Sequence, residues 1–168
     1  TSCPRRTARP WRCRPRTWFS ASTSSPRSGN GNTAAGNSAL TPNTSASHNS
    51  AFGSFALSCN TTGASNSAFG SYALGANSNG FENAAFGRTA MRNNTSGSRN
   101  VAFGRSALYA NTDGGYNSAI GFEALAANTS GDNNSALGPL ALGSNTTGSF
   151  NAAVGDLSLR SNESGLLN

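Results

Sequence analysis

The chain has 168 residues, of which 35% are hydrophobic, 11% charged and 8% aromatic, with 20 glycines and a formal net charge of +6. The apolar fraction lies below the roughly 45–50% of a typical globular protein, which excludes a thick mixed core, so something other than bulk burial must order the chain. No window approaches the roughly 18 consecutive apolar residues of a membrane span, and no charged segment followed by an apolar one opens the chain, so neither a span nor a signal peptide is predicted.

Residues 1–31 carry all of the net basicity. They contain seven arginines and no acid, for a charge of +7, whereas residues 32–168 contain five arginines and six acids, for a charge of −1. The mixture of Arg, Pro, Ser and Thr without periodicity predicts a disordered basic tail or a non-native segment. Arg-rich tails with interleaved aromatics can bind phosphates and stack on bases, but such tails are more often solvated linkers, so nucleic acid is not expected as a partner.

Residues 32–168 form an uninterrupted array of 17-residue repeats. The segment Asn-x-Ala-apolar-Gly recurs eight times at this interval, without insertion or deletion. The repeats begin at Asn32, Asn49, Asn66, Asn83, Asn100, Asn117, Asn134 and Asn151. Positions are numbered 1 to 17 from this asparagine, and the representative repeat 66–82 reads NSAFGSYALGANSNGFE. A unit of this length is too short for a helix pair and cannot bury its own apolar side, so it must stack on its neighbours.

Each repeat is expected to contain two short strands separated by turns. The first strand is predicted around positions 2 to 4 and the second around positions 7 to 9. Gly occupies position 5 in all eight repeats and position 15 in seven, which marks backbone corners where glycine supplies a positive φ and asparagine tolerates one. The predicted fold is all-β, a parallel β-solenoid of eight coils that is about 38 Å long at about 4.8 Å per coil.

In-register apolar columns predict a narrow core. Position 4 reads Ala35, Phe52, Phe69, Phe86, Phe103, Ile120, Leu137 and Val154, and position 9 reads Leu40, Leu57, Leu74, Met91, Leu108, Leu125, Leu142 and Leu159. Both columns are expected inside. Because side chains alternate along a strand, the small residues at positions 3 and 8 are expected outside, either as exposed alanine or as a self-association surface that Ala102→Glu would disrupt. The asparagines at positions 1 and 12 are expected to form amide ladders from coil to coil.

Catalytic and metal-binding residues are not predicted. His48 occupies a variable position, and the six acids share no register that would pair two carboxylates, so no base is placed to activate a nucleophile. Cys3, Cys13 and Cys59 are odd in number and lack C-x-x-C spacing, which supports neither a zinc site nor a closed disulfide framework. We therefore expect no enzyme, no cofactor and no metal.

Two sets of side chains are candidate binding surfaces. The first is a hydroxyl column at position 13, which breaks only at Glu163 and which turn chemistry also explains; Ser78 and Glu163 interrupt its threonines. Its threonines are Thr44, Thr61, Thr95, Thr112, Thr129 and Thr146. The second set consists of turn residues that differ from coil to coil, as recognition surfaces on a fixed scaffold do. Its members are Phe81, Arg99, Tyr116 and Phe150.

The run NSAFGSFALSCNTTGASNSAFGSYAL at 49–74 resembles the N-T-A-apolar-G-x-x-A-L-x-x-N-T-T-G repeats of phage tail-fibre and endosialidase-type chaperone proteins. More distantly, it is similar to the heads of trimeric autotransporter adhesins. The resemblance covers residues 32–168. It implies a left-handed parallel β-roll, a homo-trimer and a place outside the cell, on a cell surface or a virion. The function it implies is that of a structural or adhesive rod that contacts a cell-surface glycan or protein through its variable turn residues.

A second resemblance favours another class of function. The spacing N-x-A-apolar-G is similar to the N-x-V-x-G coils of grass ice-binding proteins, in which a flat ladder of small and hydroxyl residues meets ice. In this chain the Ala columns and the Thr column would form that ladder. The alternative hypothesis is therefore an ice-binding β-solenoid.

Overall fold

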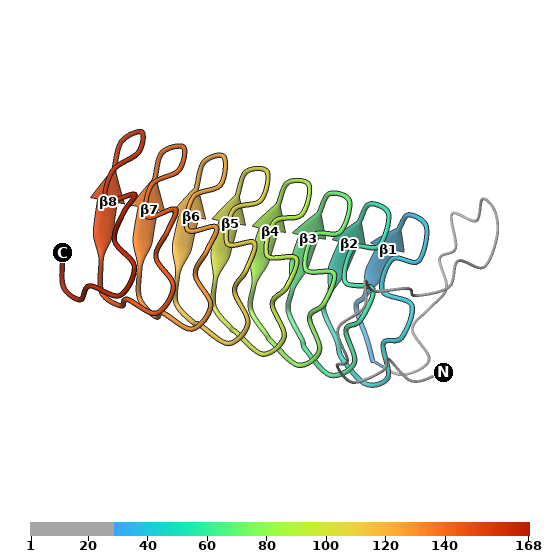
Figure 1. Ribbon diagram of the computed structural model, residues 1–168. Coiled ribbons are helices and arrows are strands. Elements are labelled where there is room, and N and C mark those ends of the chain that lie inside the picture. Colours follow the sequence, from blue (N-terminus) through green and yellow to red (C-terminus); the bar gives the residue numbers. More distant parts are fainter. Residues whose placement is uncertain (1–28) are drawn as a thin grey trace, which may run out of the picture.

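The computed structural model describes residues 29–168, so residues 1–28 of the predicted tail lie outside the described residues. Eight short strands form one parallel sheet in sequence order (Figure 1). They are β1 (Thr33–Ala35), β2 (Ser50–Phe52), β3 (Ser67–Phe69), β4 (Ala84–Phe86), β5 (Val101–Phe103), β6 (Ser118–Ile120), β7 (Ser135–Leu137) and β8 (Ala152–Val154). No residue from 29 to 168 is helical. The predicted parallel β-solenoid with one 17-residue coil per repeat is confirmed.

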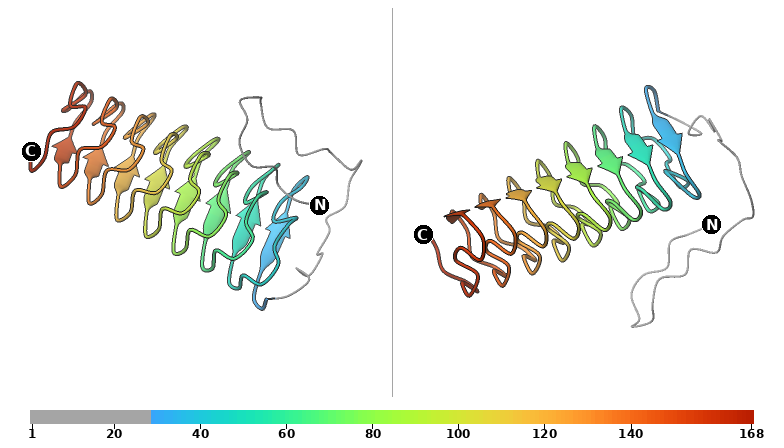
Figure 2. Two further views of the ribbon diagram at one scale, coloured as in Figure 1. Left: turned by 60° about the horizontal axis from the view of Figure 1, so that its bottom comes forward. Right: turned by 90° about the horizontal axis from the view of Figure 1, so that it is seen from above.

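Each coil pairs with the next at an offset of one repeat. In the middle of the array Ala85 lies opposite Ala102, and the Val101 N–H donates to the Asn117 carbonyl oxygen at 2.8 Å. The strands therefore follow one another in a single row along the rod (Figure 2). We number the coils 1 to 8, from the coil of β1 to the coil of β8. Coil-to-coil contact begins just before coil 1, since the His48 N–H donates to the Asn30 oxygen at 2.9 Å.

The predicted second strand is wrong. Residues 7 to 9 of each coil form a turn, and every residue at positions 7 and 9 has a positive φ, as in Tyr72 (61°) and Leu74 (49°). An extended strand cannot contain such residues, because left-handed backbone reverses the chain direction locally. The turn still bonds between coils, with the Leu74 N–H donating to the Ala90 oxygen at 3.0 Å.

The composition of the core differs from the prediction in one column. Position 9 is buried as expected, with Leu74 fully inaccessible, but the alanines at positions 3 and 8 are buried too, as Ala102 and Ala107 show. Position 4 instead faces solvent: the side chain of Phe103 is 58% exposed. Only one of positions 3 and 4 can point inward from a strand, and the narrow interior of a 17-residue coil, already occupied by leucine and asparagine, has room for a methyl group but not for a phenyl ring.

This arrangement also overturns the predicted self-association surface. The Ala columns at positions 3 and 8 lie inside the solenoid and are not available to a partner. Ala102→Glu would therefore place a charge in the core of a single chain. In each turn the neighbouring Ala at position 8 and Leu at position 9 are both buried. The in–out alternation of side chains along a strand does not apply to them, because the backbone there is not extended.

The predicted asparagine ladders are present, and they are buried except at the two ends of the array. At position 12 the Asn94 Nδ2 donates to the Asn77 Oδ1 at 2.8 Å and to the Gly97 oxygen at 2.9 Å. At position 1 the Asn83 Nδ2 donates to the same Gly97 oxygen at 2.8 Å, and its Oδ1 accepts the Asn100 N–H at 3.0 Å. Within residues 29–168 no buried side-chain nitrogen or oxygen lacks a hydrogen-bond partner. Polar ladders thus supply order that the small apolar core alone does not.

The two glycine columns have different physical causes. At position 5 the φ angles are positive, as in Gly104 (141°), and a Cβ would also lie closer than 3.0 Å to the Gly121 carbonyl oxygen of the next coil. At position 15 the φ of Gly97 is not positive, but a Cβ would lie equally close to the Gly114 oxygen and to Asn94. The prediction of a positive φ at glycine corners therefore holds for position 5 only. Close packing of the coils selects glycine at position 15.

No helix in the described part of the chain, residues 29–168, is long and apolar enough to cross a membrane.

Candidate recognition surface

A ridge of side chains at positions 16 and 17 runs along the rod where each coil passes into the next strand. Residues at position 17 have a positive φ, for example 60° in Arg99 and 58° in Tyr116. The Arg99 N–H donates to the Phe81 oxygen at 3.0 Å, and the Tyr116 N–H donates to the Ser98 oxygen at 3.1 Å. Backbone bonds between coils thus fix the positions while the side chains project outward and are free to vary in type.

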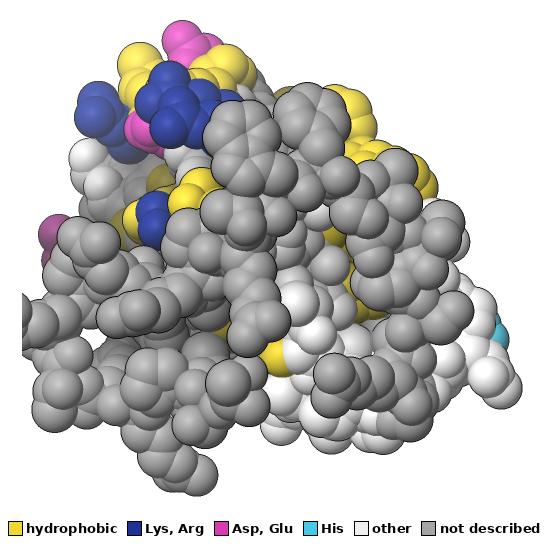
Figure 3. All heavy atoms as spheres, turned by 90° about the vertical axis from the view of Figure 1, so that its right-hand side faces the viewer, with side chains coloured by type: hydrophobic (Ala, Val, Ile, Leu, Met, Phe, Trp, Pro, Cys, Tyr) yellow, Lys and Arg dark blue, Asp and Glu magenta, His cyan; other side chains and the backbone are white. Residues whose placement is uncertain are grey.

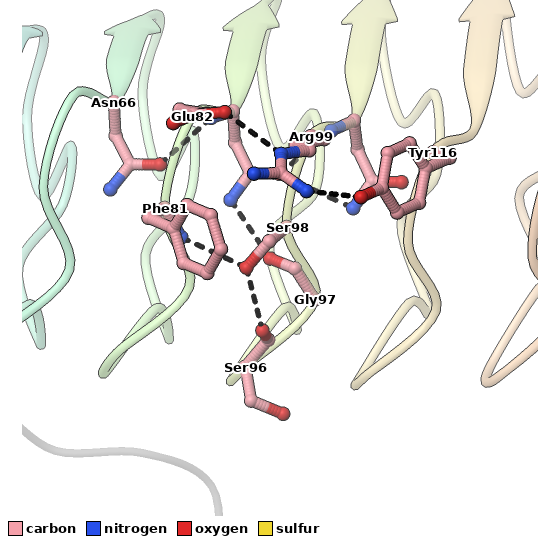
Figure 4. A network of polar contacts seen from close by, with 10 residues as sticks. Asn66, Phe81, Glu82, Ser96, Gly97, Ser98, Arg99 and Tyr116 are labelled. Atoms are coloured by element: carbon pink, nitrogen blue, oxygen red, sulfur yellow. Dashed lines mark hydrogen bonds and ion pairs between the residues drawn. The ribbon is translucent and has the colours of Figure 1, made fainter.

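Three of the four predicted recognition residues meet on this ridge (Figure 4). The Arg99 Nε lies 2.9 Å from the Glu82 Oε2, and its Nη1 donates to the Tyr116 hydroxyl. The guanidinium carbon also lies 5.3 Å from the ring centroids of both Phe81 and Tyr116, within the range of cation–π contacts. We call Phe81, Glu82, Arg99 and Tyr116 the arginine cluster. Sequence reasoning had not singled out Glu82, whose position directly after Phe81 in the variable turn was the available signal.

The arginine cluster is exposed and electrically balanced. The side chains of Arg99 and Glu82 are 45% and 54% accessible, and Tyr116 is 55% exposed. The hydrogen bond to Glu82, and secondly that to Tyr116, raises the pKa of the Arg99 guanidinium above its ordinary value. One cation and one carboxylate lie beside two aromatic rings, so the cluster offers donors, an acceptor and apolar ring surface without net charge. Such a set matches ligands that combine hydroxyl groups with C–H surface.

Phe150 lies on the same ridge but outside the arginine cluster. It is 57% exposed, and its N–H donates to the Asp132 oxygen at 3.0 Å. The coil of Asn133 separates it from Tyr116 along position 17. The structure therefore brings together Phe81, Arg99 and Tyr116 and leaves Phe150 about two coil spacings away, roughly 10 Å at the usual strand separation.

The threonine column is a line of partly exposed side chains whose donors are used inside the fold. The Thr95 hydroxyl donates to the Thr112 carbonyl oxygen at 2.9 Å, and the Thr112 hydroxyl donates to the Thr129 oxygen at 3.0 Å. The same bond recurs at Thr44, Thr61, Thr129 and Thr146. Each hydroxyl closes one more link between coils, so the column has a structural role whatever it contacts outside.

The outer face of the sheet is a surface that the sequence analysis missed. Its position 4 side chains form an aromatic ladder: the ring centroids of Phe52, Phe69 and Phe86 are 4.8 Å apart, and Phe103 follows at 5.7 Å. Ile120, Leu137 and Val154 continue the column, and none of the sixteen side chains at positions 2 and 4 is charged. We call this surface the aromatic sheet face. The signal lay in the variation of position 4 from Ala to Phe to Val, which a tightly packed interior column does not permit.

Metal-binding groups of side chains do not assemble in the described residues. From residue 29 onward no three His, Cys, Asp or Glu side chains come close enough to hold a metal ion. His48 is exposed on the ridge at the first coil, far in sequence from the acids.

No protein-family model, no curated protein and no solved structure matches this chain.

Proposed function

We propose that this chain is a structural and adhesive rod, of the kind displayed outside the cell on a cell surface or a virion, and that the arginine cluster contacts a glycan. The observation that carries the proposal is that each coil combines an invariant interior with a variable exposed ridge. Within residues 29–168 the interior repeats Ala, Leu and Asn, and every buried side-chain nitrogen and oxygen has a hydrogen-bond partner, whereas the ridge varies and gathers Phe81, Arg99 and Tyr116 in one exposed cluster. Variation on a rigid array is how repeat proteins gain specificity.

The chemistry of the arginine cluster favours a sugar without charge. Arg99 is already paired with Glu82, which reduces its attraction for a free anion. Sugar rings present hydroxyl groups, which bond to carboxylate, guanidinium and phenol groups, and C–H groups, which pack on aromatic rings.

The test is retention of the full chain on a printed array of neutral glycans. Tyr116→Ala and Arg99→Met should each reduce retention at least tenfold, since each removes a ring or donors from the cluster. Ser65→Ala changes the same position 17 in coil 2, next to Glu82 but outside the cluster, and should leave retention unchanged. Absence of retention for the parent chain, or equal retention for all variants, would overturn the proposal.

Association between copies is the second part of the proposal, and we place it on the aromatic sheet face. A surface without charge suits a partner surface without charge, and a second copy offers the same face with the same coil spacing. Charged residues are depleted at the centres of protein interfaces for the same reason. Light scattering should report a trimer, and Phe103→Glu should disperse it. A monomeric parent chain at high micromolar concentration would remove this part of the proposal.

Ice binding has less support from the geometry. The Ala columns of that hypothesis are buried, and the Thr hydroxyls donate to carbonyl groups of the next coil. We expect no thermal hysteresis from the array. Clear ice shaping that is lost when Thr95 and Thr112 are both changed to Tyr would favour ice binding over the adhesive rod.

A further inference from the structure

A pocket lies in the turns that follow β2, β3 and β4, beyond the end of each strand opposite to the ridge. Residues at positions 7, 10 and 11 of three successive coils line it. Position 10 reads Ser58, Gly75 and Arg92 along these coils, so the missing side chain of Gly75 leaves a hollow between two longer ones. The pocket has a volume of about 80 Å³, which is room for roughly five to eight water molecules at the usual minimum of 10–15 Å³ each. It thus admits a substituent of a ligand whose remainder lies across the open surface.

One wall of the pocket is a three-layer stack. The rings of Phe55 and Tyr72 are parallel to within 9°, with centroids 4.9 Å apart, and the Arg92 guanidinium lies 4.8 Å from the Tyr72 centroid. Stacked rings turn their edges sideways, and the edge of an aromatic ring carries partial positive charge. The wall is therefore both apolar and electropositive.

The surrounding turns add positive charge. Positions 6 to 11 of coils 2 to 5 contain Arg88, Arg92 and Arg105 and no acid. The acids of the corresponding turns, Glu123 and Asp156, belong to coils 6 and 8. Seen from the β1 end, arginine side chains stand with acidic and hydrophobic ones at the top of the molecule, where these turns lie (Figure 3). Among residues 29–168 the ion pair is that of Arg99 with Glu82, so no carboxylate of the described chain neutralises Arg92.

We infer that this pocket binds the carboxylate of an acidic sugar, a hexuronate, with Arg92 as the charged partner. The inference rests on the proposed function in taking the ligand to be a sugar, and it adds a second contact of different chemistry to that of the arginine cluster. The carboxylate lies beside the electropositive ring edges of Phe55 and Tyr72, and the Asn93 amide offers a donor and an acceptor to the sugar hydroxyl groups. A guanidinium held on an aromatic ring is pre-oriented, which lowers the entropy lost when it binds a carboxylate.

The experiment compares methyl β-glucuronide with methyl β-glucoside, which lacks the carboxylate, by NMR titration of the full chain. The parent chain should bind the glucuronide at least tenfold more tightly. Arg92→Met should abolish that preference, and Gly75→Tyr should reduce binding of the glucuronide by filling the pocket. The latter variant is compatible with the fold because Tyr109 occupies the same position 10 two coils away.

Arg160→Met is the matched control, since Arg160 also occupies position 10 but lies in coil 8 and outside the pocket. Its preference for the glucuronide should equal that of the parent. No binding of the glucuronide by the parent chain, or a preference that persists in Arg92→Met, would overturn the inference.

The proposals for the two sites can be disproved independently. Retention on neutral glycans that depends on Tyr116, without glucuronide binding, would overturn the pocket and leave the proposed function intact. Glucuronide binding that depends on Arg92, without retention on any neutral glycan, would support the pocket and remove the role of the arginine cluster.

Discussion

Ala102 and Phe103 are neighbours in β5, yet the first is fully buried and the second is 58% exposed. Position 3 is Ala in all eight coils, while position 4 runs through Ala, Phe, Ile, Leu and Val. The comparison teaches that in a coil this small the volume available in the interior determines which residue is invariant. The larger and more hydrophobic residue is the one that faces outward, which is the reverse of the usual expectation from hydrophobicity.

The largest expected effect comes from placing the same charge on the two sides of this strand. Ala102→Glu buries a carboxylate without a partner and should lower the free energy of unfolding by about 3 kcal/mol or more. Phe103→Glu places the charge in solvent and should change the stability of the single chain by no more than about 1 kcal/mol. Chemical denaturation of both variants, followed by circular dichroism at a concentration where the chain is monomeric, measures the difference. Equal losses would mean that the inward and outward assignments are mistaken.

Glycines inside and outside the two constrained columns provide a second comparison. Gly104 combines a φ of 141° with a close approach to the Gly121 carbonyl, so Gly104→Ala should cost roughly 2–4 kcal/mol through strain and overpacking. Gly75 has no positive φ and occupies a position where Ser58 fits in the preceding coil. Gly75→Ser should therefore stay within about 1 kcal/mol of the parent. A midpoint of thermal unfolding that shifts equally in both variants would contradict the role assigned to position 5.

The repeat made the solenoid, its parallel pairing and its Asn ladders predictable, because a 17-residue period without insertions or deletions allows only stacked coils. The side of the strand that faces inward was not predictable from hydrophobicity. Phe86 and Phe103 carry the apolar surface expected of a core, and only the volume left by Leu and Asn excludes them. The prediction of a second strand was wrong for a related reason, since Tyr72 and Leu74 adopt a positive φ that neither residue favours locally. Coil-to-coil hydrogen bonds impose that backbone, and a propensity read from one repeat does not contain them.

The sequence predicted some of the candidate recognition residues. Variation among coils pointed to Arg99 and Tyr116, but their mutual contact depends on the 17-residue offset that places position 17 of successive coils side by side. Glu82 belongs to the same column and was visible only as a lone acid. The pocket at Gly75 had no sequence signal, because it arises where one coil lacks a side chain that both neighbouring coils carry.

Neighbouring asparagines at positions 11 and 12 provide a third comparison of intermediate size. Asn94 donates to Asn77 and Gly97, and it accepts from the Asn111 amide at 2.7 Å. Asn94→Ala leaves the Asn77 oxygen without its donor inside the solenoid and should cost about 2–3 kcal/mol. Asn93→Ala is the same chemical change one residue earlier, where other coils carry Ala, and should be nearly neutral. If the denaturant midpoints of the two variants coincide, the asparagine ladder orders the coils without adding to the free energy of unfolding.

The smallest effect on stability is expected at the arginine cluster, where the largest effect on binding is proposed. Arg99 and Glu82 are both about half exposed, and ion pairs between exposed side chains contribute little to stability, so Arg99→Met should lower the melting temperature by only a few degrees at most. Hydrogen bonds to Glu82 and Tyr116 raise the pKa of Arg99, and a raised pKa adds stability that is complete below the unfolded value and is lost only as pH rises through the folded one. The difference between parent and variant should therefore stay constant from about pH 6 to about pH 9, far below the ordinary pKa of arginine. Thermal scans across that range would test this, with Ser65→Ala as the control on the same ridge. A difference that disappears within the range would mean that a group other than Arg99 controls the stability of the ridge.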